Sequence, residues 1–146
     1  MFSILIPTFN NFKYLKLCIN SIVKNSNVNH EIIIHVNEGS DGTLDFVKEN
    51  NFKHTFSNKN IGLCSSINAA SKLTTSKYIL YSHDDMYFCP EWDHYLNKEI
   101  DILGHDNFYL SGTMIEPNSG HIKFNCGDSI ENFDEKKLLN NYKSIN

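Results

Sequence analysis

The 146-residue chain lacks arginine, so its 13 basic side chains other than histidine are all lysines. With 17 acidic side chains, the formal net charge at pH 7 is -4. We therefore expect no nucleic-acid partner, because nucleic acids bind to basic faces. Lysine, asparagine and isoleucine are abundant, as in proteins from AT-rich genomes, so a single lysine or asparagine is a weak functional signal.

The chain also lacks a C-x-x-C pair. Its four cysteines are widely scattered, at Cys18, Cys64, Cys89 and Cys126. This spacing argues against a zinc site or a thioredoxin-like motif, and it fits reduced thiols in a cytosolic protein.

No apolar run is long enough to span a bilayer. The run at 2–7 is too short for a signal peptide and has no basic lead. We therefore expect no transmembrane segment and a cytoplasmic location, with the full-length protein able to work at the inner face of a membrane.

Short apolar runs alternate with stretches of helical spacing, which predicts strands and helices in turn. Strands are predicted at 2–6, 31–36, 54–57 and 78–81, the first of them stopped by Pro7. Helices are predicted at 12–24, 43–49 and 62–72. Weaker patterns predict a helix at 92–103, strands at 108–111 and 122–124, and a surface helix at 133–142. The alternation predicts an α/β fold with a mainly parallel sheet and helices on both faces, and the length suits one domain.

Polar residues follow three of the predicted strands. In parallel sheets, ligands bind outside the carboxyl ends of the strands. The segments 7–10, 37–41 and 82–86 are therefore expected to converge on one crevice.

Asp84 and Asp85 are the strongest candidates for a ligand site. Adjacent carboxylates repel each other, and a divalent cation relieves that repulsion. Mg²⁺ and Mn²⁺ often combine one or two carboxylates with substrate phosphates. The alternative interpretation is a solvated acidic turn.

Two other strand ends carry candidates with a structural alternative. Glu38 is placed to hydrogen-bond a base or ribose, or the segment is a glycine-containing turn in which Asp41 caps the next helix. Phe9 is suited to stack on a base, with Thr8 and Asn10 as polar contacts, or Asn10 is simply a helix N-cap.

Weaker candidates are His83, as a metal or phosphate contact, and Asn68, on a helix that could face the crevice. No Walker or Rossmann glycine pattern occurs, and no Ser/His/Asp set can be picked out.

Taken in order, these segments resemble the family 2 glycosyltransferases with the GT-A fold. The resemblance rests on four segments: 3–10, 31–43, 60–62 with Asn68, and 78–85. They cover about the first two thirds of the chain in the family's order, and this joint agreement is more specific than any single motif.

The resemblance implies a metal-dependent, inverting transfer of sugar from a nucleoside-diphosphate sugar to a glycan, lipid or protein acceptor, with Mg²⁺ or Mn²⁺ as cofactor. It implies that Pro7 and Phe9 flank the base and that Glu38 contacts it. It also implies that Asp84 approaches the ribose or sugar and that Asp85 holds the metal.

The sequence departs from the family pattern in three ways. Asn37-Glu38 stands where Asp-Asp is common, and His83 stands where the first carboxylate of the D-x-D motif is common. The family's catalytic base lies well downstream, and the chain ends at Asn146 apparently before that point, so no base is nominated. We therefore expect a GT-A-like nucleotide-sugar-binding domain over 1–146, truncated before the acceptor-binding part.

Two other functions compete with this interpretation. A nucleotidyltransferase would need a glycine-rich basic loop after the first strand, which the sequence lacks. A non-catalytic nucleotide-sugar-binding or interaction module of the same fold would need no base.

Overall fold

The computed structural model describes residues 1–118 and 120–145. They form two compact units, Met1–Asp93 and His94–Asn146, each described here by itself. The prediction of one domain over 1–146 rests on the length of the chain and on the lack of a low-complexity linker.

The first unit is built on a four-stranded parallel sheet. Its strands are β1 (Phe2–Phe9), β2 (Glu31–Asn37), β3 (Lys53–Ser57) and β4 (Tyr78–Tyr81), in the order β3-β2-β1-β4. Its helices are α1 (Phe12–Asn25), α2 (Thr43–Glu49) and α3 (Leu63–Ser71). The predicted parallel α/β fold is confirmed, and each predicted element of this unit is found within a few residues of its expected bounds.

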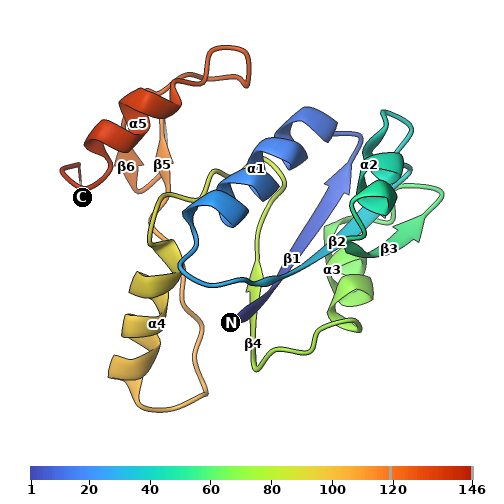
Figure 1. Cartoon of the computed structure of the whole chain (residues 1–146), viewed down its shortest axis with the longest axis horizontal. Coiled ribbons are helices and arrows are strands. Elements are labelled where there is room, and N and C mark those ends of the chain that lie inside the picture. Colours follow the sequence, from blue (N-terminus) through green and yellow to red (C-terminus); the bar gives the residue numbers. More distant parts are fainter. Residues whose placement is uncertain (119, 146) are drawn as a thin grey trace. The chain divides into compact units, whose positions relative to one another are not determined.

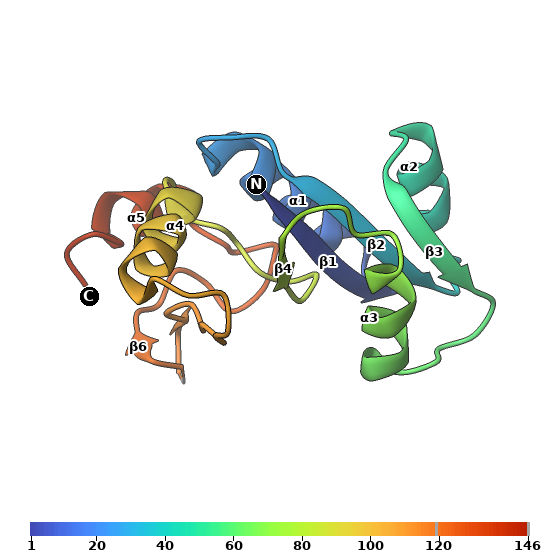
Figure 2. The same cartoon turned by 90° about the horizontal axis from the view of Figure 1, so that it is seen from below.

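The helices cover both faces of the sheet, as predicted. Figures 1 and 2 show α1 and α2 on one face and α3 on the other. On the α3 face, Leu5 and Ile33 form a buried cluster with Ala70. On the opposite face, the rings of Phe12 and Phe46 lie 5.3 Å apart and join α1 to α2. The two central strands, β1 and β2, are therefore buried on both faces.

The first strand runs past Pro7 to Phe9, so the prediction that it stops at Pro7 is wrong. On one side, Pro7 is paired with β2. On the other side, the ladder between β1 and β4 ends with the pair Leu5–Tyr81, where the carbonyl of Leu5 accepts the N–H of Ser82. The missing N–H of Pro7 faces this side, where β4 has already ended, so proline costs the sheet no hydrogen bond.

Glu31 joins the amino ends of the strands. Its carboxylate accepts hydrogen bonds from the hydroxyls of Ser3 and Thr75, the backbone N–H of Thr75 and the ammonium of Lys53. The Ser3 hydroxyl in turn accepts the N–H of Ser76 at 3.1 Å. Although burial opposes it, this set of donors lowers the pKa of Glu31 to about 2.

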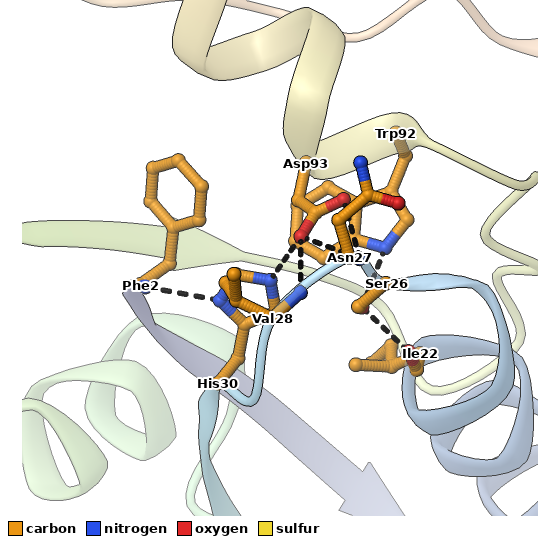
Figure 3. A network of polar contacts seen from close by, with 8 residues as sticks. All are labelled: Phe2, Ile22, Ser26, Asn27, Val28, His30, Trp92 and Asp93. Carbon is orange, nitrogen blue, oxygen red and sulfur yellow. Dashed lines mark hydrogen bonds and ion pairs between the residues drawn. The ribbon is translucent and has the colours of Figure 1, made fainter.

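A second polar network centres on His30 and Asp93 (Figure 3). The Nδ1 of His30 accepts the backbone N–H of Phe2 at 3.1 Å, so the ring proton lies on Nε2, which faces Asp93 at 3.1 Å. The same carboxylate accepts the backbone N–H groups of Asn27 and Val28 at 2.9–3.2 Å. One buried carboxylate thus fixes the α1–β2 connection to the start of β1.

The network also fixes the start of α4 (Trp92–Leu103), because the indole N–H of Trp92 donates to the Ser26 hydroxyl at 3.0 Å. Burial lowers the pKa of His30, which keeps the ring neutral. Burial opposes ionisation of Asp93 as well, but the backbone N–H groups and His30 outweigh it and lower the pKa of Asp93.

The second unit contains the rest of α4, the short strands β5 (Ile115–Glu116) and β6 (Ile122–Lys123), and α5 (Glu135–Asn141). Asp134 caps α5 by accepting the N–H of Lys137 at 2.9 Å. The strand predicted at 108–111 is wrong. This segment has no strand partner and Tyr109 is 92% exposed, so β propensity alone does not form a strand there.

Within residues 1–118 and 120–145, no helix combines the length and apolar character that crossing a membrane requires.

The Glu31 network predicts a pH-dependent loss of stability. The carboxylate stabilises the fold above pH 4.5, and this contribution is lost as the pH falls from 4.5 towards 2. Glu31→Gln should therefore lower the free energy of unfolding by about 1 kcal/mol at pH 7 and by less at pH 3, measured by urea unfolding. An equal loss at both pH values would contradict this account.

The His30–Asp93 network predicts a larger effect. Asp93→Ala removes the acceptor of three buried donors and should lower the free energy of unfolding at pH 7 by about 3 kcal/mol. Asp101→Ala, at an exposed position of α4, is the matched control and should change it by less than about 0.5 kcal/mol. Similar losses in both variants would show that Asp93 has no special role.

Candidate functional site

A cleft of about 300 Å³ lies at the carboxyl ends of β1 and β2. It brings together residues from all three segments that were predicted to converge there. The residues that line it are Pro7, Thr8, Phe9, Asn10, Asn11, Asn37, Asn60, Gly62, Leu63, Ser66 and Asp84.

Five of the predicted site residues line this cleft: Pro7, Thr8, Phe9, Asn10 and Asp84. The other four lie outside its lining: Glu38, Asn68, His83 and Asp85. Asn68 is exposed on α3, and it follows Ser66, which faces the cleft, by two residues. Two residues turn a helix by roughly 200°, so the two side chains point in opposite directions.

The ends of β1 and β2 both carry a non-glycine residue in the left-handed region. These residues are Asn10 (φ 46°) and Glu38 (φ 61°). The Asn10 amide lies 3.4 Å from the Glu38 carboxylate, and its Oδ1 accepts the N–H of Ser40 at 3.0 Å. Phe9, the last residue of β1, has 46% of its surface exposed. Strained backbone of this kind gathers at functional sites, and here it presents an aromatic ring and a carboxylate at one strand edge.

The turn after Glu38 depends on a glycine. A Cβ on Gly39, whose φ is +69°, would lie 2.7 Å from Cγ1 of Val36 and 2.9 Å from Cβ of Leu44. No larger residue fits this turn without displacing α2, so the position of Glu38 at the edge of the site follows from a local steric limit.

Asp41 caps two helices. Its carboxylate accepts the N–H of Phe12 at the start of α1 (2.8 Å) and the N–H of Thr43 at the start of α2 (3.1 Å). The predicted hydrogen bond to the helix after it is found, although the N-cap position of α2 is Gly42 and Asp41 precedes it by one residue. The alternative in which Asn10 caps α1 is wrong, because the N-cap position is Asn11 and its side chain makes no capping bond. Both asparagine side chains are therefore directed to other partners.

Asp84 is the carboxylate inside the cleft. Its Oδ1 accepts the Asn11 amide at 3.1 Å. Burial raises the pKa of Asp84, the charge of Asp85 adds to this shift, and the Asn11 amide opposes it. The Thr8 hydroxyl is close enough to oppose it too, yet its buried Oγ1 meets no partner at hydrogen-bond geometry within the described residues. The cleft thus holds a destabilised carboxylate beside an unsatisfied polar atom.

Asp85 and His83 are exposed on either side of Asp84 in sequence. The Nε2 of His83 lies 2.8 Å from the Tyr81 hydroxyl, which leaves Nδ1 as its other donor atom. Among the described residues, no group of three His, Cys, Asp or Glu side chains is arranged to hold a metal ion. The candidate metal ligands at this edge are therefore the carboxylates of Asp84 and Asp85. A carboxylate pair suits an ion that takes its other ligands from water and phosphate.

Sequence reasoning missed a functional-site residue, Asn37. Its side chain is buried and hydrogen-bonded to the ends of β1 and β3 and to α3. The signal in the sequence is a polar residue that closes a run of buried strand positions, within the segment 37–41 that is expected at the crevice.

Among the described residues, the four cysteines form no disulfide with one another. Cys18 is buried under the connection that carries Asp84, with its Sγ 3.7 Å from the carbonyl of His83. Burial raises the pKa of Cys18 to about 12, so this thiol packs as an apolar group.

The four-stranded parallel sheet with helices on both faces is an α/β fold of the GT-A class. The family model described as Glycosyl transferase family 2 matches residues 3–145. The chain belongs to this family.

Two curated relatives support the assignment. One is an uncharacterized glycosyltransferase from Rickettsia bellii (strain RML369-C), 28% identical over 119 residues, which are 78% of this chain and 16% of the relative. The other is the dolichyl N-acetyl-alpha-D-glucosaminyl phosphate 3-beta-D-2,3-diacetamido-2,3-dideoxy-beta-D-glucuronosyltransferase of Methanococcus voltae, 41% identical over 58 residues, which are 38% of this chain and 18% of the relative. The chain thus spans less than a fifth of the length of either relative.

Among solved structures, the chain is similar to residues 1–349 of TarS from S. aureus. The TM-score is 0.62 at 26% identity, over 69% of this chain and 32% of that one. The same protein in complex with UDP-GlcNAc matches with a TM-score of 0.62, and in complex with UDP with a TM-score of 0.61.

The raised pKa of Asp84 predicts that this residue costs stability. An aspartate whose pKa is higher in the folded state favours unfolding wherever it is ionised, so the cost is present at pH 7 and disappears in acid. Asp84→Asn should raise the free energy of unfolding at pH 7 by about 0.5–1 kcal/mol, because the neutral amide still accepts from Asn11. Urea unfolding measures it, with Asp101→Asn as control, and a loss of stability would refute the assignment.

Proposed function

We propose that the cleft binds a nucleoside-diphosphate sugar, and that the protein transfers the sugar to an acceptor. The observation that carries the proposal is the position of Asp84, a partly buried carboxylate in the cleft formed by the ends of the first two strands. The complexes of TarS with UDP-GlcNAc and UDP, a protein of the same fold at 26% identity, support this choice of ligand.

In this proposal the exposed ring of Phe9 stacks on the base, with Pro7 on its other side. Glu38 accepts a hydrogen bond from the base or ribose, since its carboxylate is held at the strand edge by Asn10. Thr8 and Asp84 lie deeper and contact the ribose or sugar, which would supply the missing partner of the buried Thr8 hydroxyl.

Asp85 is the carboxylate that would hold a Mg²⁺ or Mn²⁺ ion shared with the diphosphate, with His83 Nδ1 as a further ligand. When bound, such an ion offsets the charge of the departing diphosphate. A cation beside Asp84 would favour its ionised carboxylate and so oppose the effect of burial, which raises the pKa of this residue.

The transfer step that we propose is inverting: a base deprotonates the acceptor hydroxyl as it attacks the anomeric carbon from the side opposite the diphosphate. We assign that base to no residue of this chain, and the acceptor is a glycan, a lipid or a protein. The wide spacing of the cysteines in the sequence favours reduced thiols, so we extend the proposal to the cytoplasm.

Calorimetry with UDP-, GDP- and dTDP-sugars, with and without Mn²⁺, tests the binding step. We expect metal-dependent binding of at least one sugar nucleotide, weakened about tenfold or more by Asp85→Asn, since a charged ligand contact contributes about 1.5–3 kcal/mol.

Asp101→Asn is the control and should bind like the unchanged protein. The absence of binding by every sugar nucleotide, in a sample shown to be folded by circular dichroism, would overturn the proposal. A second assay measures the release of free nucleoside diphosphate in the presence of an acceptor. A transferase releases it, whereas a non-catalytic module binds the sugar nucleotide without releasing it.

A further inference from the structure

Asn37 lies at the end of β2, is only 3% exposed, and has protein partners for every polar atom of its side chain. Its Nδ2 donates to the carbonyl of Thr8 at 3.1 Å and to the hydroxyl of Ser66 at 3.0 Å. Its Oδ1 accepts the backbone N–H of Ile61 at 2.9 Å. The Ser57 hydroxyl lies 3.2 Å from the same oxygen and shares its one proton with the carbonyl of Lys59.

Two backbone groups fix the orientation of this amide. The Thr8 carbonyl can only accept a hydrogen bond, so the atom facing it must be the NH₂ group. The Ile61 N–H can only donate, so the atom facing it must be the amide oxygen. The side chain is therefore oriented by its surroundings and has no freedom to turn towards a ligand.

The partners of Asn37 come from segments that are far apart in sequence. Thr8 is the last residue but one of β1, Ile61 lies in the β3–α3 connection, and Ser66 is in the first turn of α3. The Ser66 hydroxyl also donates to the carbonyl of Gly62 at 2.7 Å, so one chain of hydrogen bonds runs from β1 through Asn37 into the start of α3. The residues beside Ile61 and at the start of α3 form one wall of the cleft: Asn60, Gly62, Leu63 and Ser66.

We infer that Asn37 is a positioning residue for the cleft. It holds the wall formed by 60–66 against the ends of the strands, and it makes no polar contact with the ligand itself. The identity of that ligand rests on the proposed function. The claim that Asn37 holds the wall rests on the hydrogen bonds alone. Recognition of the base at the end of β2 is then left to Glu38.

Aspartate cannot take this position without loss. One oxygen of its carboxylate would face the Thr8 carbonyl, which can only accept a hydrogen bond, and a buried charge would replace a neutral amide. The acidic pair that is common at this place in the family is therefore incompatible with the surroundings of Asn37 in this chain.

A purely apolar attachment of α3 is the competing explanation. Leu5, Ile33 and Ala70 already form a buried cluster between the sheet and the helix. If that cluster alone held the wall, removal of the amide would destabilise the whole fold without a selective effect on 60–66. Local opening therefore distinguishes the two explanations.

Hydrogen exchange of the ligand-free chain, followed by mass spectrometry, tests the inference together with the dissociation constant for the tightest sugar nucleotide. In Asn37→Asp we expect exchange over 58–66 to rise roughly tenfold while the amides of β1 and β2 stay protected, because about 1.4 kcal/mol of local stability is lost. We also expect the dissociation constant to rise about tenfold. Asn20→Asp, at an exposed position of α1, should change neither.

Unchanged exchange over 58–66 would overturn the inference, and so would faster exchange with an unchanged dissociation constant. If the unchanged protein binds no sugar nucleotide, the proposed function fails, and the exchange result alone decides whether Asn37 holds the wall. If Asn37→Asp does not fold, Ser66→Ala removes one acceptor of the amide in a helix-compatible way. It should accelerate exchange over 58–66 about threefold, and no acceleration would contradict the inference.

Discussion

The β1–β4 ladder ends at the pair of Leu5 and Tyr81, and the cleft depends on this ending. Beyond it, Pro7 has no N–H to offer a neighbouring strand, while β1 continues beside β2 to Phe9. The chain after β4 is therefore free to leave the sheet and place Asp84 beside Asn11 across the cleft. Pro7, which lacks a backbone N–H, thus marks the point where the pairing of β1 with β4 stops and the cleft begins.

The two ends of the sheet differ in their electrostatics. At the amino ends, Glu31 is surrounded by donors, and its pKa is lowered to about 2. At the carboxyl ends, burial raises the pKa of Asp84, and Asn10 and Glu38 occupy left-handed backbone. The first arrangement favours folding and the second opposes it. Proteins accept such local cost where a ligand supplies the missing interaction.

Much of the first unit could be predicted from the sequence, because buried parallel strands leave continuous apolar runs such as Ile32-Ile33-Ile34. The strand-end rule then placed Thr8 and Asp84 in one cleft although they are 76 positions apart in the sequence. The continuation of β1 past Pro7 could not be predicted, because it depends on where the neighbouring strand β4 ends, which only the tertiary structure shows. The segment at 108–111 was misread because a strand needs a partner that no local pattern reveals.

The side-chain hydrogen bonds could not be predicted from the sequence for a related reason. Asn37 looks like a substitution in a motif until its bonds to Thr8 and Ile61 are seen. Asp41 caps two helices, and only one of them follows it directly in the sequence. In both cases the role depends on groups from other strands or helices, whose approach is set by the fold.

The central claim is that a nucleoside diphosphate occupies the cleft between Phe9 and Asp84. Titration of the isotope-labelled chain with UDP in the presence of Mg²⁺, followed by NMR, tests it most directly. The account predicts that the amide resonances of residues 8–11, 61–63 and 84–85 shift together with one dissociation constant. Shifts confined to other parts of the chain, or none with UDP and with GDP and dTDP in turn, would contradict it.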